Sequence, residues 1–279
     1  MKKTLLSALI IATLSLQGCS TLNSLVAKDD SEKTVEEFYE SATTAFKASM
    51  WDTAIQEYEK LKSFYPYGDY TEQSYLELAY AYYRYSEPES AIRELDEFIR
   101  QFPKHPNVDY ALYLQALSAD SINKSWLDKF LTDPANRDIQ STLRAFQHYS
   151  ELINQFPDSR YAPAANKRLI VLHNQMARQE LLVAQFYFDK QAYLAAANRV
   201  TYILENYPQT VVTLDSLALL EQAYSKLEMP EMAHDIRKVY QLNQENLKPT
   251  LQAAKQKQLE NQNKNWWQKT TDFFDGVSE

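Results

Sequence analysis

Helix-forming stretches of the chain repeatedly end in an aromatic residue followed by proline. The motif occurs as "LKSFYP", "FIRQFP", "LINQFP" and "ILENYP", and its prolines are Pro66, Pro103, Pro157 and Pro208. Proline cannot continue a helix, and it biases the residue before it away from the α region. The pattern therefore predicts one helical unit that is copied along the chain and stopped at the same point in each copy.

A small residue recurs twelve positions before each of these prolines. These residues are alanines, and a fifth alanine continues the series: Ala54, Ala91, Ala145, Ala196 and Ala233. Their separations of 37, 54, 51 and 37 residues each equal the roughly 34 residues of a tetratricopeptide repeat plus an insertion. Such repeats place small residues where two helices touch. We therefore expect an all-α fold, a right-handed solenoid of five tetratricopeptide (TPR) helix-turn-helix repeats.

Repeats three and four carry most of the extra length. In repeat three, the inserted residues 120–140 fit between the two helices. In repeat four, "APAANKRLIVLHNQMARQELLVAQFYF" has no breaker after Pro163, which predicts a long first helix with Pro163 in its first turn. Glu245 stands where a proline would end repeat five, so the last helix is expected to run on.

Composition supports a helical, folded chain. Of 279 residues, 45% are hydrophobic, and only three are glycine, so the chain can bury a substantial core. The formal net charge is -8, and no basic tract suited to phosphates is present, which argues against nucleic acid as a partner.

The first residues have the pattern of an export signal. Lys2 and Lys3 precede an apolar run that ends in "LQGC" at Cys19, the single cysteine of the sequence. This segment resembles the lipobox of bacterial lipoproteins, which implies acylation of Cys19 and an outer-membrane anchor facing the periplasm. An ordinary signal peptide with an incidental thiol is the alternative. We assign 1–18 to the signal peptide, 19–32 to a tether, 33–245 to the repeats and 246–279 to a helical or flexible tail.

Catalytic and cofactor signatures are missing from the sequence. Three glycines cannot build a phosphate-binding loop, and no H-E-x-x-H or G-x-S-x-G motif occurs. The four histidines are scattered, with no cysteine nearby to share a metal. We therefore expect no catalytic residue, no metal and no cofactor apart from the lipid on Cys19, and a protein that binds and is not an enzyme.

The first helices of the early repeats carry many aromatic residues. In tetratricopeptide proteins the first helix of each pair lines a concave groove, and this resemblance implies that the groove-facing positions are Tyr39, Thr43, Phe46 and Lys47 in repeat one and Leu76, Tyr80, Tyr83 and Arg84 in repeat two. Aromatic rings with a few cations suit an apolar or aromatic-ended peptide that carries a carboxylate. The alternative is that tyrosines pack between the repeats. We favour the core for Tyr75 and Tyr82, and both interpretations stay open for Tyr80 and Tyr83.

Several segments resemble the BamD family, the lipoprotein subunits of the outer-membrane β-barrel assembly (Bam) machine. They are "YPYGDYTEQSYLELAYAYYRY" at 65–85, "HPNVDYALYLQAL" at 105–117, "TDPANRD" at 132–138, "KRLIVL" and "NRVTYILENYP". The resemblance implies a scaffold that binds the POTRA domains of BamA, other Bam lipoproteins and unfolded barrel precursors. It also implies that Arg199 pairs with an acidic residue of BamA, and that Tyr65, Gly68 and Tyr70 form a loop at the precursor-binding end.

Two features depart from that family. Asp52 stands where members can carry a basic residue, and residues 246–279 extend past the family core. In this tail, Trp266 and Trp267 recur seven residues later as Phe273 and Phe274, which would place four rings on one helical face. That face would suit a membrane surface, a partner's groove or the end of the solenoid. A different envelope scaffold, such as a pilotin or a peptidoglycan-protein scaffold, is the alternative function.

Overall fold

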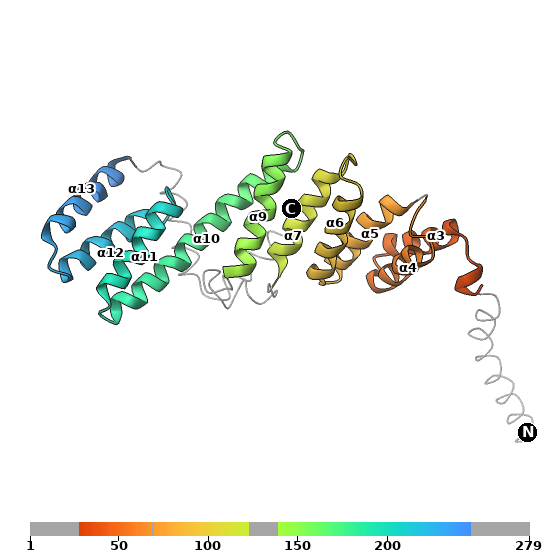
Figure 1. Cartoon of the computed structure of the whole chain (residues 1–279), viewed down its shortest axis with the longest axis horizontal. Helices are drawn as coiled ribbons and strands as arrows, with labels where there is room; N and C mark the ends of the chain where they lie inside the picture. Colours follow the sequence, from red (N-terminus) through yellow and green to blue (C-terminus); the bar gives the residue numbers. More distant parts are fainter. Residues whose placement is uncertain (1–27, 69, 123–138, 247–279) are drawn as a thin grey trace, which may run out of the picture. The chain divides into compact units, whose positions relative to one another are not determined.

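The computed structural model describes residues 28–68, 70–122 and 139–246, and these residues form helices and no strand. A short 3-10 helix, η1 (Asp30–Glu32), precedes the α-helices (Figure 1). Their bounds are α3 (Val35–Lys47), α4 (Trp51–Phe64), α5 (Thr71–Arg84), α6 (Pro88–Gln101), α7 (Val108–Ser121), α9 (Ile139–Gln155), α10 (Ala162–Asp189), α11 (Tyr193–Asn206), α12 (Thr213–Lys226) and α13 (Pro230–Asn246). The all-α prediction is confirmed.

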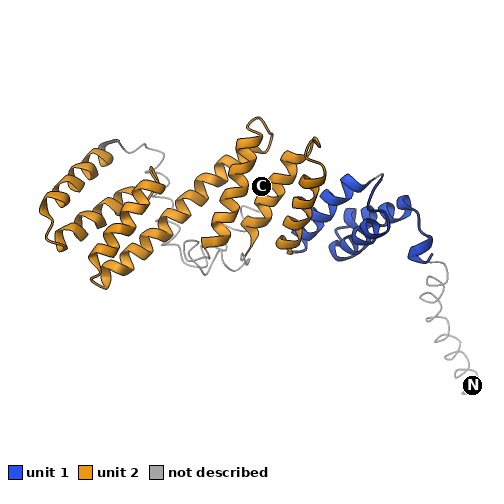
Figure 2. Ribbon diagram, viewed as in Figure 1, with its two compact units in different colours: residues 1–85 blue, residues 86–279 orange. Residues whose placement is uncertain are grey.

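The chain divides into two compact units, residues 1–85 and 86–279 (Figure 2). In unit 1, α4 packs against both α3 and α5. In unit 2, successive described helices from α6 to α13 pack against each other. Each unit is therefore a series of helical hairpins, which is the arrangement that the TPR spacing predicts. The right-handed course of the solenoid stays a prediction.

The predicted repeat landmarks lie where the pattern puts them. All five alanines are buried in the second helix of a pair, on α4, α6, α9, α11 and α13. At the ends of the first four of these helices, the aromatic residue before proline donates its backbone N–H to the carbonyl four residues earlier, at 2.8 Å in every case; the donors are Tyr65, Phe102, Phe156 and Tyr207. The following proline has no N–H, so the helix ends there.

Helix starts also follow local chemistry. Thr34 caps α3 by accepting from the backbone N–H of Glu37, whose side chain in turn accepts from the Thr34 N–H, a capping box. Pro88 and Pro163 occupy the first turns of α6 and α10, where a missing N–H costs nothing. The predicted position of Pro163 is thereby confirmed.

The irregular lengths also match expectation. α10 runs for 28 residues, twice the length of α11, so the long first helix of repeat four is confirmed. α7 ends at Ser121 and α9 begins at Ile139, so each helix reaches two residues into the predicted insertion 120–140, and residues 123–138 between them lie outside the described residues. α13 runs for 17 residues to Asn246, which confirms that the last helix passes Glu245.

Described residues just before α3 form ion pairs with each other and with α4. Asp30 of η1 pairs with Lys60 of α4 at 2.9 Å and with Lys33 at 2.6 Å. These lysines hold the pKa of the Asp30 carboxyl below its usual range, with the Lys33 hydrogen bond the larger cause. The end of the segment assigned as a tether therefore contacts α4.

Candidate binding surfaces

Aromatic side chains from all three helices of unit 1 meet around Trp51. Its ring centroid lies 5.5 Å from that of Phe46 and 5.9 Å from that of Tyr80. Phe46 lies 5.6 Å from Tyr80, and Tyr83 lies 6.3 Å from Tyr80. Phe46 belongs to α3, Trp51 begins α4, and the two tyrosines belong to α5. We call these four residues and Arg84 the Trp51 cluster.

The guanidinium of Arg84 lies over these rings. Its Cζ is 4.9 Å from the Trp51 ring centroid and 5.8 Å from that of Tyr80, and its Nη1 donates to the Tyr80 hydroxyl at 3.0 Å. Such a stack contributes roughly 0.5–1 kcal/mol at an exposed site. Within the described residues, Arg84 pairs with no carboxylate. Its positive charge is therefore available to an anionic group of a ligand.

A second group of aromatic residues surrounds Tyr39 on α3. Tyr39 stacks on Tyr70, with ring centroids 4.2 Å apart. Its hydroxyl donates to Glu77 at 3.5 Å, and the hydroxyl of buried Tyr58 donates to the same carboxylate at 2.6 Å. We call these four residues the Tyr39 cluster. The Tyr58 ring also lies 6.3 Å from Phe46, so Tyr58 joins this cluster to the Trp51 cluster, and we call the two together the aromatic surface.

Internal donors satisfy the carboxylate in the Tyr39 cluster. Besides the two tyrosines, Gln73 donates to Glu77 at 2.9 Å. Burial and the nearby Glu77 charge raise the pKa of Tyr39 to about 12, and burial followed by the Glu77 hydrogen bond raises the pKa of Tyr58. Both hydroxyls therefore stay protonated donors at neutral pH, and Glu77 is not the group that would bind a ligand cation.

Three described residues between α4 and α5 have defined contacts or backbone angles: Tyr65, Gly68 and Tyr70. The Tyr65 hydroxyl donates to the Lys33 carbonyl at 2.7 Å. Gly68 has φ +121°, a conformation that residues with a Cβ rarely adopt. Tyr70 has φ 69° at the start of α5. The backbone here therefore turns the Tyr70 ring onto Tyr39.

The structure brings most of the predicted groove residues together. Phe46, Tyr80, Tyr83 and Arg84 lie in the Trp51 cluster, Tyr39 and Tyr70 lie in the Tyr39 cluster, and Tyr65 and Gly68 lie in the segment that positions Tyr70. The sequence reasoning did not select Trp51 for this surface. The available signal was a tryptophan at the start of a helix, five positions after Phe46.

One predicted groove position is wrong. Leu76 is only 4% exposed, because α5 is covered on more than one side and the whole run Ser74–Leu76 is buried. The groove position that the tetratricopeptide resemblance implies for Leu76 requires an open face at that point of α5, and the burial of Leu76 removes it. The expected core positions Tyr75 and Tyr82 are buried, as predicted, while Tyr80 and Tyr83 are half-buried.

Arg199 lies on α11 and forms an ion pair within unit 2. Its Nη1 donates to Oε2 of Glu180 on α10 at 2.9 Å. Glu180 is buried, whereas the Arg199 side chain is 38% exposed. Part of the guanidinium therefore remains accessible. Glu180 could not be predicted as the partner, because it lies 19 positions from Arg199 on another helix and no local pattern links the two residues.

An exposed tyrosine lies one turn after Arg199. Residues three apart are neighbours on a helix surface, and Tyr202 is exposed at that spacing. Its ring lies 6.0 Å from Tyr207. Burial, then a hydrogen bond with Tyr202 and the charge of Glu180, raise the pKa of Tyr207 to about 12. We call Arg199 and Tyr202 the Arg199 surface, a cation beside an aromatic ring.

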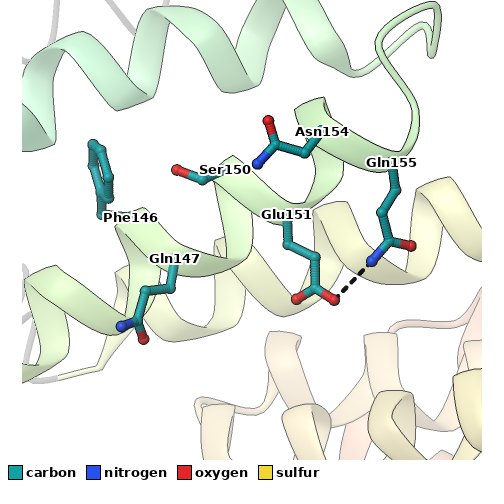
Figure 3. Close-up of a pocket in the computed structure, with 6 residues that line it drawn as sticks. All are labelled: Phe146, Gln147, Ser150, Glu151, Asn154 and Gln155. Carbon is teal, nitrogen blue, oxygen red and sulfur yellow. Dashed lines mark hydrogen bonds between the residues drawn. The ribbon is translucent and has the colours of Figure 1, made fainter.

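A shallow hollow of about 390 Å³ lies along α9 (Figure 3). A single helix lines it, with Phe146, Ser150 and Asn154 on one side and Gln147, Glu151 and Gln155 on the other. Gln155 donates to Glu151 at 2.9 Å. Because its polar groups come from one face of one helix, the hollow does not surround a small molecule as ligand sites do.

Two predicted features lie outside the described residues: the acylation site Cys19 and the aromatic tail from residue 247 onward. The described helices include none with both the length and the apolar character needed to cross a membrane.

Comparison with known proteins identifies relatives along most of the chain. The family described as YfiO, outer membrane lipoprotein, matches residues 31–239. The "Outer membrane protein assembly factor BamD" of Neisseria meningitidis serogroup B is 38% identical over 87% of this chain and 91% of the relative. Proteins of the same name from Xylella fastidiosa and Vibrio cholerae are 34% and 32% identical, over 86% and 87% of this chain and 81% and 99% of the relative. The chain therefore belongs to the YfiO family of outer membrane lipoproteins, together with these BamD proteins.

Proposed function

We propose that this chain is an outer-membrane protein assembly factor, a lipid-anchored subunit of the Bam complex that works by binding. In this proposal the aromatic surface of unit 1 receives unfolded barrel proteins, and the Arg199 surface of unit 2 binds a POTRA domain of BamA. The names of the relatives support the assembly role. The geometry of the two surfaces supports the division of tasks.

The observation that carries the precursor-binding role is the position of Arg84. Its guanidinium lies over Trp51 and Tyr80 and pairs with no described carboxylate. An extended peptide that ends in an aromatic residue presents a ring and a carboxylate close together. The rings of the Trp51 cluster would pack against that ring, and Arg84 would pair with the carboxylate.

The test is binding of the full chain to a fluorescent peptide that ends in phenylalanine. Tyr80→Ala with Tyr83→Ala should weaken binding at least tenfold, because the rings around Trp51 lose two of their members. Tyr85→Ala is the matched control, because Tyr85 directly follows Arg84 in the chain and its side chain is exposed. Equal loss in both variants, or no loss in the double variant, contradicts the assignment.

The charge of the peptide provides a second arm of this test. A peptide with an amidated C-terminus lacks the carboxylate, so it should bind more weakly to the wild type than the free acid does. Arg84→Gln should bind both peptides alike. A preference for the free acid that survives in Arg84→Gln would assign the carboxylate to another cation.

The Arg199 surface is tested by pull-down with the POTRA domains of BamA. Charge reversal at Arg199 is a poor probe, because Arg199→Glu would place two carboxylates together beside a helix interface. Tyr202→Ala changes the exposed neighbour and leaves the ion pair intact. We expect it to reduce retention of the POTRA domains, and full retention would remove Tyr202 from the interface.

The anchor is tested separately. Metabolic labelling with a palmitate analogue should label the wild type and not Cys19→Ser, and the variant should be released from outer membranes. Label on the Cys19→Ser variant, or no label on the wild type, would contradict acylation at Cys19.

A further inference from the structure

The described residues that precede α3, residues 28–33, are bound to α4, and we call them the N-terminal strap. Asp30 pairs with Lys60 of α4 at 2.9 Å and with Lys33 at 2.6 Å. The Lys33 ammonium also lies 3.9 Å from Oε2 of Glu57 on α4, a buried oxygen that accepts no hydrogen bond from the described residues. A buried carboxylate oxygen needs a compensating charge nearby. The ion pairs therefore hold the strap on α4 at both Asp30 and Lys33.

The strap also contacts the residue that ends α4. The Tyr65 hydroxyl donates to the Lys33 carbonyl at 2.7 Å. The Lys33 ammonium lies over the ring of buried Phe38 on α3, 5.0 Å from its centroid, and the Tyr65 ring lies edge-on to the same ring at 6.2 Å. Lys33 thus contacts α4 through its ammonium and Tyr65 through its carbonyl. A single strap residue therefore fixes the point at which the connection to α5 begins.

The other end of this connection has an unusual backbone. Tyr70 has φ 69°, which residues with a Cβ seldom adopt. Such a conformation persists only where its surroundings hold it in place. The Tyr70 ring is held by stacking on Tyr39, and the chain that leads to it starts five residues earlier at Tyr65. Releasing Tyr65 would therefore free one of the two ends that keep Tyr70 in this conformation.

We propose that the N-terminal strap positions Tyr70 on Tyr39 by holding Tyr65, and thereby couples the anchor end of the chain to the aromatic surface. Cys19, to which we assign the lipid, lies nine positions before Lys28, so the chain that leads to the anchor enters the fold at this strap. The positioning of Tyr70 is argued from contacts within unit 1. Its effect on precursor binding rests on the proposed function.

Fluorine NMR of the full chain labelled with 3-fluorotyrosine tests the positioning. The Tyr70 resonance is the one missing from Tyr70→Phe, and Tyr67, which is 85% exposed, gives the reference for a ring in solvent. Asp30→Lys places three lysines together, so it should release the strap and move the Tyr70 resonance at least halfway toward the reference. Glu32→Lys makes the same charge change at an exposed strap residue that has no ion pair among the described residues, and it should leave the resonance in place.

A second variant separates the strap from general damage to unit 1. Tyr65→Phe keeps a ring beside Phe38 and removes only the hydrogen bond to the Lys33 carbonyl, so it should move the Tyr70 resonance in the same direction. If the strap acts through Tyr65, Asp30→Lys should add no further shift in the Tyr65→Phe background. Additive shifts, or a Tyr70 resonance that Tyr65→Phe leaves unmoved, would overturn the proposal.

Binding of the fluorescent peptide that ends in phenylalanine tests the coupling to the aromatic surface. Asp30→Lys and Tyr65→Phe should each bind it at least threefold more weakly than the wild type, and Glu32→Lys should bind it equally well. Unchanged binding in variants whose Tyr70 resonance has moved would overturn the coupling. A wild type that does not bind the peptide would contradict the proposed function instead, and the fluorine spectra would still decide whether the strap positions Tyr70.

Discussion

Arg199 donates one hydrogen bond to Glu180, a carboxylate buried on the neighbouring helix, while part of its guanidinium faces solvent. The arginine therefore has a stabilising contact inside unit 2 as well as an accessible face. Removing Arg199 alone removes the accessible face and also lowers stability. The stability falls because the buried Glu180 carboxylate, left without its partner, carries a desolvation cost.

Arg199→Ala is expected to lower the free energy of unfolding by about 1–3 kcal/mol, toward the lower end because the arginine side of the pair is partly exposed. Adding Glu180→Gln removes the unpaired charge, so the double variant should recover most of that stability. Urea unfolding measures both. A double variant as unstable as Arg199→Ala would contradict the account of this pair.

The double variant Arg199→Ala with Glu180→Gln isolates the role of Arg199 in binding. It should fold like the wild type and still fail to retain the POTRA domains of BamA, whereas Glu180→Gln alone should retain them. Retention by the stable double variant would show that Arg199 serves only the fold.

Tyr58→Phe should cost more stability than Tyr39→Phe. The Tyr58 hydroxyl is buried and donates to Glu77 at 2.6 Å, while the Tyr39 hydroxyl reaches the same carboxylate at 3.5 Å, the limit of a hydrogen bond. Loss of the short bond to a charged acceptor should cost about 1.5–3 kcal/mol, and loss of the long one less than about 1 kcal/mol. Equal costs in urea unfolding would mean that Glu77 does not distinguish the two donors.

Ser216→Ala should stabilise unit 2. The Ser216 side chain is fully buried in α12, and its hydroxyl has no hydrogen-bond partner among the described residues. Alanine removes that desolvation cost and favours helix more than serine does. We expect a gain of roughly 0.5–1.5 kcal/mol in thermal or urea unfolding. Ser225→Ala, exposed on the same helix, gains helix propensity but loses a hydrogen bond from its hydroxyl to the Glu221 carbonyl at 2.9 Å and relieves no buried group, so it should gain less, and equal gains in the two variants would refute the burial argument.

His148 should make the protein less stable in mild acid. Burial, then the charge of Arg144, lowers the pKa of this histidine, while Asp96 and Glu151 act in the opposite direction. Its Nδ1 is buried, and no hydrogen-bond partner for it occurs in the part of the chain that the structure describes. Because the folded pKa is lowered, the unfolded chain binds the proton more readily, so stability is full above the unfolded value of about 6.5 and falls as the pH drops below it.

His148→Gln should therefore lose less stability than the wild type between pH 7.5 and pH 5.5, measured by urea unfolding at each pH. Carboxylates elsewhere respond equally in both proteins, so the difference between the two slopes reports His148. Identical slopes would mean that the histidine is protonated in the folded chain as easily as in the unfolded one.

The repeat architecture could be predicted because its signals are local. Each alanine and each proline acts within its own helix pair, so their spacing located the helices of all five repeats. The binding surfaces depend on contacts between helices. Glu180 and Glu77 were missed for that reason, and Leu76 was misplaced because its helix is covered on more than one side.

The length of α10 has a consequence for how unit 2 unfolds. Its first half contacts α7 through Arg168 and Asp120 and α9 through Gln175 and Thr142. Its second half packs against α11 and α12, where Ala184 lies in their shared core. In an array of independent repeats, unfolding can stop at any boundary between neighbours. α10 is one continuous helix that contacts α7 and α9 with its first half and α11 and α12 with its second half, so it couples these two groups of helices. We therefore expect them to unfold together in one cooperative step.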